Sequence, residues 1–326
     1  MTTPDDDVTG GSRHERAISI LVPVDGSAES LEAIDYASQF RAGRILILRV
    51  EVDEPADGQG NDDAYNRWRR EHMDTVTRQL EDEVREHVAA AGSVEYLIRY
   101  GNPAEQIMDE AQEHDLVVMN SSGKGAAGRL LFGSVTDRVV RFGTTPTLVI
   151  RVSKNQVSAV KPERVVAPLD GSELAESAIP VAARVARSLS VPIHLVRCVG
   201  MDEVLQTVRE MRASTKGWIY NIGDDPYEMA RERTDAEALK YLEKVRDRLG
   251  AEGLAATVEL LGGTAAFELL EAVRRNDLVV MTSRGQGGMQ RWMLGSVSEK
   301  LLREAKAPVL LIPVGRTGNE GRSAAQ

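Results

Sequence analysis

Short apolar runs alternate with longer segments of mixed apolar and charged residues along the first half of the chain. Apolar runs of about 4–8 residues without alternation are typical of strands buried on both faces of a parallel sheet. The mixed segments have helical periodicity, and Ser27 is a suitable N-cap for the first of them, which extends to about Arg41. The pattern therefore predicts strands at 18–24, 44–50, 94–99, 115–119 and 146–150, with helices between them.

Strands that alternate with helices predict a parallel, doubly wound α/β sheet. Such sheets bind ligands outside the carboxyl ends of their strands, at the point where the strand order reverses. Asp25 and the loop over 120–134 each follow a predicted strand. We therefore expect both to lie at this edge of the sheet.

The second half of the chain repeats the first. ILVPVDGS (20–27) recurs as VVAPLDGS (165–172), which places Asp25 opposite Asp170, and HDLVVMNSSGKG (114–125) recurs as NDLVVMTSRGQG (276–287). The offset between the copies grows from 145 to 162 residues, so the second copy carries an insertion of 17 residues near 201–227. A repeat of this length predicts two tandem copies of one domain.

The predicted organisation is a disordered tail over 1–15, a first domain over 16–152, a linker over 153–162, a second domain over 163–315 and a tail over 316–326. The insertion contains Trp218, Tyr220 and Tyr227. It leaves two alternatives, a lid or interface on the one hand and a cover over an edge of the core on the other.

Each copy has a glycine-containing loop after its fourth predicted strand. Asn120-Ser121-Ser122-Gly123 is followed, after nine intervening residues, by Gly133-Ser134, and Thr282-Ser283-Arg284-Gly285 by Gly295-Ser296 at the same spacing. Backbone N–H groups in such a loop, and at the start of the helix that follows it, form an anion site. The alternative is a plain strand-to-helix turn with a serine N-cap, and Asp25 and Asp170 likewise suit turns whose carboxylate caps the next helix.

Two other phosphate motifs are excluded. The segment 123–128 matches G-x-G-x-x-G, but it follows the fourth strand instead of the first, and the second copy does not keep it. No G-x-x-x-x-G-K-[ST] sequence occurs.

The formal net charge of −10 argues against nonspecific binding to nucleic acid or to an anionic membrane. No run approaches the ~20 apolar residues of a transmembrane helix, and the N-terminus lacks the features of a secretory signal. Cys198 is the single cysteine, so an intrachain disulfide is impossible, and no His or Cys pair has metal-ligand spacing. These features favour a cytoplasmic protein without a protein-bound metal.

The aspartate after the first strand, the G-x2-G-x9-G-[ST] type of loop after the fourth and the final apolar strand together resemble the universal stress protein family, over about residues 15–152 and 162–315. The resemblance implies two tandem Rossmann-like, doubly wound parallel-sheet domains with strand order 3-2-1-4-5. It also implies that ATP, with Mg²⁺ compensating phosphate charge, binds at the carboxyl edge. The last strands would pair, either between the two copies or with a second chain in a homodimer.

The resemblance assigns nucleotide contacts to matched positions in both copies. Pro23 and Asp25, with Pro168 and Asp170, match the positions near adenine and ribose. Val50 and Cys198 match the strand-two position whose backbone meets adenine. The phosphate loop corresponds to Asn120, Gly123, Gly133, Ser134 and Val135 in the first copy and to Thr282, Gly285, Gly295, Ser296 and Val297 in the second.

The sequence departs from the family's pattern at two positions of each copy. Asn120 and Thr282 replace the first glycine of the loop, and Arg49 and Arg197 stand where the family often has His. Asn120 and Thr282 can either crowd the phosphates or hydrogen-bond to them. The affinity for ATP therefore depends on where these two side chains point.

Three functions are compatible with these observations: an ATP-binding regulator in stress response, an adaptor of the same fold that binds no nucleotide, and a slow ATPase. The H-x-G-H and S-G-G-x-D-[ST] signatures of related nucleotide-handling enzymes are absent. No general base is evident beyond Asp25 and Asp170. We therefore expect a nucleotide-binding regulator and not a dedicated enzyme.

Overall fold

The computed structural model describes residues 17–51, 63–88, 93–121, 133–151, 160–214, 225–284 and 294–314. The predicted tails and most of the predicted linker lie outside these residues. The first copy consists of β1 (Ile18–Val24), α1 (Ala28–Ala37), β2 (Ala42–Glu51), α2 (Asp63–Val84), β3 (Val94–Tyr100), α3 (Pro103–Ala111), β4 (Leu116–Asn120), α4 (Ser134–Phe142) and β5 (Thr147–Ile150). The predicted strands are confirmed, and α1 begins after its predicted N-cap, Ser27, whose side chain accepts a hydrogen bond from the Ser30 N–H.

The second copy has the same order with two changes. It consists of β6 (Arg164–Pro168), α5 (Glu173–Glu176), α6 (Ile179–Leu189), β7 (Ile193–Val199), α7 (Met201–Ser214), α8 (Pro226–Ala251), β8 (Ala256–Gly262), α9 (Ala265–Ala272), β9 (Asp277–Thr282), α10 (Ser296–Glu304) and β10 (Val309–Ile312). The counterpart of α1 is divided into α5 and α6 because Pro180, in the first turn of α6, cannot continue a helix whose carbonyl at Glu176 lies four residues before it. The second change is the additional helix α7.

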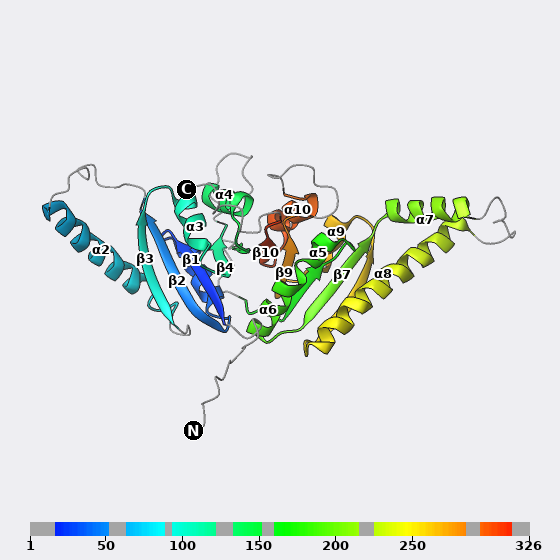
Figure 1. Cartoon of the computed structure of the whole chain (residues 1–326), viewed down its shortest axis with the longest axis horizontal. Coiled ribbons are helices and arrows are strands. Elements are labelled where there is room, and N and C mark those ends of the chain that lie inside the picture. The colour runs from blue at the N-terminus through cyan, green and yellow to red at the C-terminus, as the bar shows by residue number, and fades with distance from the viewer. Residues whose placement is uncertain are drawn as a thin grey trace, which may run out of the picture.

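Ten strands form one sheet in the order β3-β2-β1-β4-β5-β10-β9-β6-β7-β8 (Figure 1). Each copy therefore has the predicted order 3-2-1-4-5, with parallel pairing inside the copy. The copies join through β5 and β10, which pair antiparallel with Val149 opposite Val309. This confirms the expectation that the last strands pair, and it settles that they pair within one chain.

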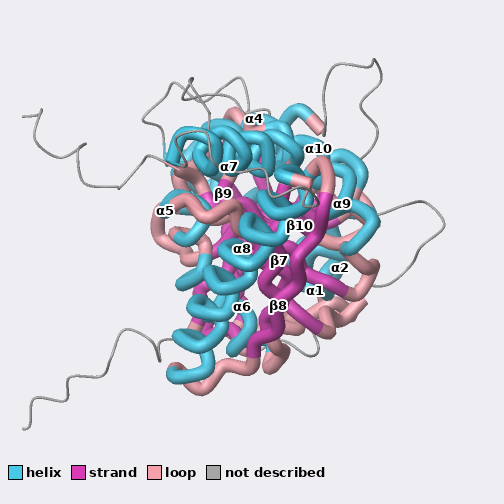
Figure 2. The backbone as a smooth tube through the Cα atoms, turned by 90° about the vertical axis from the view of Figure 1, so that its right-hand side faces the viewer, coloured by secondary structure: helices cyan, strands magenta, loops and turns pink. Residues whose placement is uncertain are grey.

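Helices cover both faces of the sheet (Figures 1 and 2). One apolar core runs through both copies, because buried residues of α1, α2, α6 and α8 belong to a single cluster with strand residues of each copy. The other face has two clusters, one beneath α3 in the first copy and one beneath α9 and α10 of the second copy that also takes in Val140 and Val149 of the first. The buried, unalternating strands, such as β1 with all its residues buried, follow from this two-sided cover.

An ion pair crosses between the copies beside the shared core. Arg184 of α6 donates two hydrogen bonds to Asp115, which precedes β4, at 2.9 and 2.8 Å. The same carboxylate accepts the backbone N–H of Ser19 at 2.9 Å. The equivalent aspartate of the second copy, Asp277, is instead paired with Arg164 of its own copy. The Arg184–Asp115 pair therefore links the two copies, whereas the Arg164–Asp277 pair lies within the second copy.

The described part of the insertion covers an edge of the core. Val204 and Val208 of α7 are buried together with Val199, Ala230 and Ala238. This supports the second of the two alternatives for the insertion, while Trp218 and Tyr220 lie outside the described residues. Among the described helices, none is long and apolar enough to cross a membrane.

The pair between Arg184 and Asp115 predicts measurable coupling between the copies. Asp115→Ala and Arg184→Ala should each lower the free energy of unfolding, and the double variant should lose less than their sum, with a coupling of about 1 kcal/mol for a bidentate, partly exposed pair. Urea denaturation of the four proteins measures it. The more exposed Arg138–Glu105 pair, which lies within one copy, is the matched control and should give a coupling below ~0.5 kcal/mol. Equal coupling for the two pairs would contradict the role assigned to Arg184.

Candidate nucleotide site

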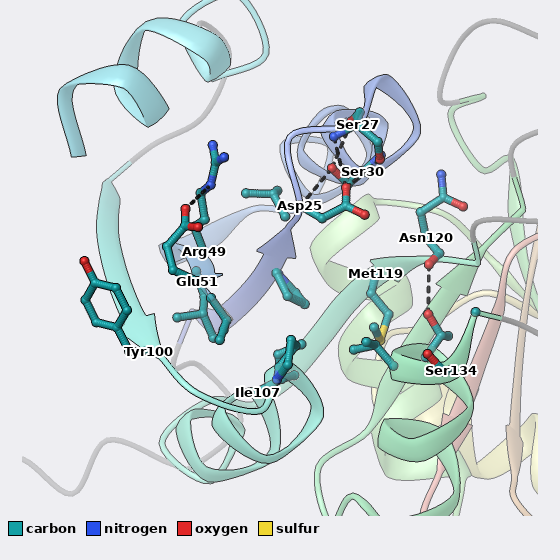
Figure 3. Close-up of a pocket in the computed structure, with 18 of the residues that line it drawn as sticks. Asp25, Ser27, Ser30, Arg49, Glu51, Tyr100, Ile107, Met119, Asn120 and Ser134 are labelled. Carbon is teal, nitrogen blue, oxygen red and sulfur yellow. Dashed lines mark hydrogen bonds and ion pairs between the residues drawn. The ribbon is translucent and has the colours of Figure 1, made fainter. Parts of the chain in front are cut away.

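A cavity of about 600 Å³ opens at the carboxyl edge of the first copy, where β1 and β4 lie side by side and the strand order reverses (Figure 3). Ligand sites of this kind have volumes of about 300–1,000 Å³. The lining comes from the ends of β1, β2 and β4, the starts of α1 and α4, and residues of α2, β3 and α3. Asp25 and Ser134 both belong to it, so the structure brings together the two motifs that the sequence separates by more than a hundred residues.

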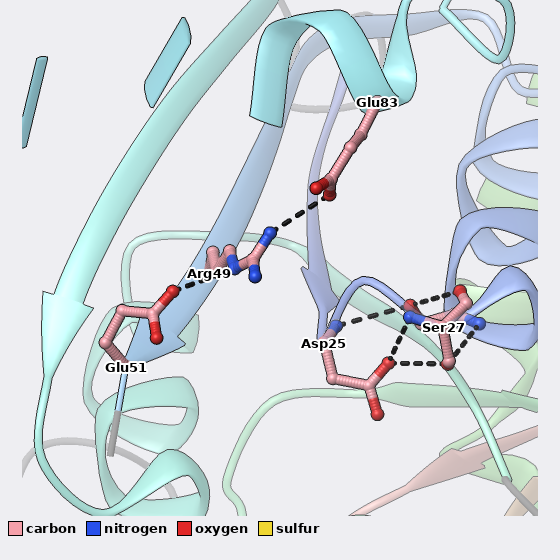
Figure 4. Close-up of polar contacts among 6 residues, drawn as sticks. Asp25, Ser27, Arg49, Glu51 and Glu83 are labelled. Carbon is pink, nitrogen blue, oxygen red and sulfur yellow. Dashed lines mark hydrogen bonds and ion pairs between the residues drawn. The ribbon is translucent and has the colours of Figure 1, made fainter. Parts of the chain in front are cut away.

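Asp25 braces the turn that opens α1. Its Oδ1 accepts hydrogen bonds from the Ser27 N–H at 3.0 Å and the Ser27 hydroxyl at 2.5 Å (Figure 4). Partial burial alone would raise the pKa of Asp25, but the hydrogen bonds from Ser27 and Ser30 outweigh it and hold the pKa below its usual value. The helix is capped by Ser27, not by Asp25, so the alternative in which the carboxylate serves as the N-cap is wrong. Asp170 and Ser172 repeat the arrangement at 3.0 and 2.6 Å.

The start of α4 forms the opposite wall of the cavity. Gly133 occupies the N-cap position, no side chain caps the helix among the described residues, and Ser134 is its first residue. The serine N-cap considered from the sequence is therefore wrong for Ser134, and also for Ser296, because Gly295 is the N-cap of α10. An uncapped helix start favours an anionic ligand through its N–H groups and its dipole. Val135 and Val297 follow in the first turns, while Gly123 and Gly285 lie outside the described residues.

The two residues in place of the family's first glycine point in different directions. The Asn120 amide nitrogen donates to the backbone carbonyl of Glu29 in α1, so the side chain ties the end of β4 to the helix beside Asp25. The Thr282 hydroxyl instead donates to the carbonyl of Arg284, within its own loop. The two loops therefore differ in where the side chain that replaces the first glycine points, and the affinity for ATP is expected to depend on that direction.

Arg49 lies over the turn that contains Asp25. Its guanidinium group donates to Glu51 at 2.9 Å and to Glu83 of α2 at 3.0 Å (Figure 4). Its Nη1 atom lies 3.6 Å from the place a Cβ would take at Gly26, which has a φ of +77°. The arginine that replaces the family's His thus holds α2 against the strand ends of the site.

Several lining residues were not found by sequence reasoning. These are His72 of α2, Tyr100 at the end of β3 and Ile107 of α3. The predicted residues Pro23 and Val50 line the cavity as well. Tyr100 directly follows the third predicted strand, which covered 94–99, so the sequence could have indicated its place at the carboxyl edge. His72 gave no such signal, because the register of a long amphipathic helix against the sheet is set by packing.

The second copy places its matched residues at the corresponding strand ends. Pro23 pairs with Leu48, and Pro168 pairs with Val196. Counting onward from these pairs, Cys198 corresponds to Val50. Its thiol donates to the Gly263 carbonyl at 3.3 Å, and burial raises its pKa to about 11, with Glu268 and Glu203 adding to the effect. Among the described residues, no group of three or more His, Cys, Asp or Glu side chains could hold a metal ion.

Comparison with known proteins agrees with this geometry. Residues 19–151 and 162–313 match the universal stress protein family, so the chain belongs to that family, with two domains in tandem. A universal stress protein of Mycobacterium tuberculosis strain H37Rv is 25% identical over 319 residues, which cover 92% of this chain and 98% of that protein. A universal stress protein of Bacillus subtilis is 28% identical over 146 residues, 44% of this chain and 94% of its own, and so corresponds to one copy.

A solved structure has the same fold over most of this chain. The crystal structure of a universal stress protein from Archaeoglobus fulgidus aligns with a TM-score of 0.60 at 20% identity, over 91% of this chain and 98% of that one. A structure described as a universal stress protein in complex with cAMP covers 42% of this chain and 99% of its own, at 26% identity and a TM-score of 0.32.

The raised pKa predicts that Cys198 is chemically inert near neutrality. With a pKa of about 11, only about one thiol in a thousand is ionised at pH 8, and the thiolate is the reactive form. Iodoacetamide should therefore alkylate Cys198 in the folded protein at least ~100-fold more slowly than in the urea-denatured chain, with a rate that climbs from pH 9 to pH 11. Mass spectrometry of quenched samples gives both rates. Similar rates in the two states would show that the thiol is not held as described.

Proposed function

We propose that the first copy binds an adenine nucleotide, ATP with Mg²⁺, and that the protein acts as a nucleotide-dependent regulator in the stress response. The proposal rests on one cavity that offers a hydrogen-bond acceptor at one end and hydrogen-bond donors at the other, as a nucleotide requires. An ionised Asp25 faces it from β1, and the uncapped start of α4 faces it from the other side. A ribose hydroxyl is a donor suited to the carboxylate, and phosphate oxygens are acceptors suited to helix N–H groups and the Ser134 hydroxyl.

The base has an apolar place in the same cavity. Leu48, Val50, Ile107 and Met119 line it between the two polar ends. An aromatic ring that carries polar groups at its edge fits such a lining when backbone groups at a strand end supply its hydrogen bonds. This agrees with the contact that the family resemblance assigns to Val50.

The charges that line the cavity favour a metal–nucleotide complex over the bare nucleotide. Asp25 and Glu51 are acidic, and Arg49, the arginine among the described lining residues, already pairs with Glu51 and Glu83. Mg²⁺ carried by the phosphates lowers the negative charge that must enter beside these carboxylates. We therefore assign Mg²⁺ to the ligand and not to protein side chains.

Binding and regulation suit this site better than dedicated catalysis. A general base works best with a pKa near the working pH, whereas the pKa of Asp25 is lowered. The site is also joined to the contact between the copies, because α4 contributes Val140 to the cluster that contains Leu301 and Leu302 of α10. A nucleotide that orders the start of α4 would act on that contact. Because β5 and β10 already pair with each other, a homodimer would need a different surface.

The proposal predicts nucleotide-dependent stabilisation that is reduced on removal of the Ser134 hydroxyl. ATP with Mg²⁺ should raise the melting temperature of the whole protein, and heat-denatured protein as purified should release adenine nucleotide. Ser134→Ala should weaken ATP about tenfold, the usual loss for one hydrogen bond to a charged group. Thermal shift and calorimetric titration measure both effects, and Arg303→Ala on the exposed face of α10 serves as the control.

Other outcomes would favour the alternatives. If purified protein releases no nucleotide and ATP with Mg²⁺ gives no thermal shift, the adaptor of the same fold takes the place of the regulator. ATP turnover that disappears in Asp25→Ala while binding persists would favour a slow ATPase.

A further inference from the structure

The strand-two ends of the two copies have different surroundings. From the pairing of Pro23 with Leu48 and of Pro168 with Val196, the residue that corresponds to Glu51 is Val199. The Glu51 side chain is 34% exposed and lines the first cavity. Val199 is 0% exposed, because α7 begins two residues later and packs Val204 against it. Among the described residues, this strand end lines the cavity in the first copy and is covered by a helix in the second.

The first turn of α7 also places a carboxylate at this strand end. Glu203 accepts a hydrogen bond from Arg197 at 2.9 Å and one from the Gly200 N–H at 3.4 Å. Arg197 lies over the turn of Asp170, with its Nη1 atom 2.9 Å from the place of a Cβ at Gly171, closer than the matching approach of Arg49 to Gly26. The acid that pairs with the strand-two arginine therefore comes from the insertion itself.

Charged side chains surround the position expected to meet the base. Glu268, Glu203 and Arg231 lie near enough to the Cys198 thiol to influence its pKa. Arg231 of α8 lies over Gly262, the counterpart of Tyr100, and Glu268 of α9 lies over Gly263. In the first copy the same position is Val50, which lines the cavity and packs against the apolar cluster that contains Leu48 and Ile107. Placing a base beside Cys198 would remove the charges of the Arg197–Glu203 and Arg231–Asp235 pairs from water without new partners.

We propose that the second copy has exchanged nucleotide binding for closure by its own insertion, so that the chain binds one nucleotide, in the first copy. The inference rests on the proposed function of the first cavity. The phosphate end of the second copy keeps its motif, with Gly295 and Ser296 at the start of α10, whereas its base end is built from α7, α8 and α9. The repeated motif therefore marks two related folds and a single site.

The number of nucleotides bound by the full chain tests this directly. Calorimetric titration and equilibrium dialysis with ATP and Mg²⁺ should give one equivalent per chain. The double variant Asp25→Ala/Ser134→Ala should bind none, with its fold checked by thermal unfolding, while Glu237→Ala on the exposed face of α8 should still bind one. Two equivalents in the unmodified protein, or one remaining in the double variant, would overturn the inference. No binding by the unmodified protein would instead overturn the proposed function.

Photolabelling of the unmodified protein assigns the copy without any variant. With 8-azido-ATP and Mg²⁺, crosslinks should fall in peptides from the end of β2 and the start of α3. Excess ATP should suppress them. Comparable, ATP-suppressed labelling at the ends of β7 and β8 would show that the second copy also accepts a base.

Discussion

The antiparallel pairing of β5 with β10 is the contact on which the rest of the molecule depends. A parallel sheet exposes an unpaired strand at each edge, and an apolar edge strand is prone to pair with whatever meets it. Here each copy supplies the partner of the other, with Val149 opposite Val309 in a single sheet of ten strands. The same contact brings α1 and α6 into one core and sets α4 against α10. The start of α4 also lines the candidate site, so the site is connected to the second copy through the apolar cluster shared by α4 and α10.

Within this near-symmetric frame the two copies differ at specific residues. Asp115 pairs with Arg184 of the second copy, whereas Asp277 pairs with Arg164 of its own copy. Asn120 ties the first loop to α1, whereas Thr282 folds back onto its own loop. The arginine near the end of the second strand, Arg49 or Arg197, pairs with α2 in the first copy and with the inserted helix α7 in the second. Duplication explains the shared frame, and these contacts explain how one copy can keep a ligand cavity while the other closes.

The sequence predicted the strand order, the pairing of the last strands and the position of both aspartates, because buried apolar runs and a repeated motif carry that information locally. It did not predict the division of α1's counterpart, although Pro180 was a readable signal. It could not predict that Arg49 pairs with Glu83, or Arg184 with Asp115, since those partners are far apart in sequence and meet only through packing. The motif made the two sites look equivalent, because it contains neither the inserted helix α7 nor the charged residues of α8 and α9, Arg231 and Glu268, that lie at the second one.

In the proposed assignment, nucleotide binds at the Asp25 turn and at the start of α4, and it does not bind at the equivalent place in the second copy. Amide hydrogen exchange of the full chain, with and without ATP and Mg²⁺, tests it most directly, because it reports on every backbone N–H at once. With nucleotide bound, we expect slower amide exchange at the turn after β1, in the first turn of α4 and in the β5–β10 pair. Exchange at the Asp170 turn and at the start of α10 should not change. Equal protection of both copies, or protection of neither, would contradict it.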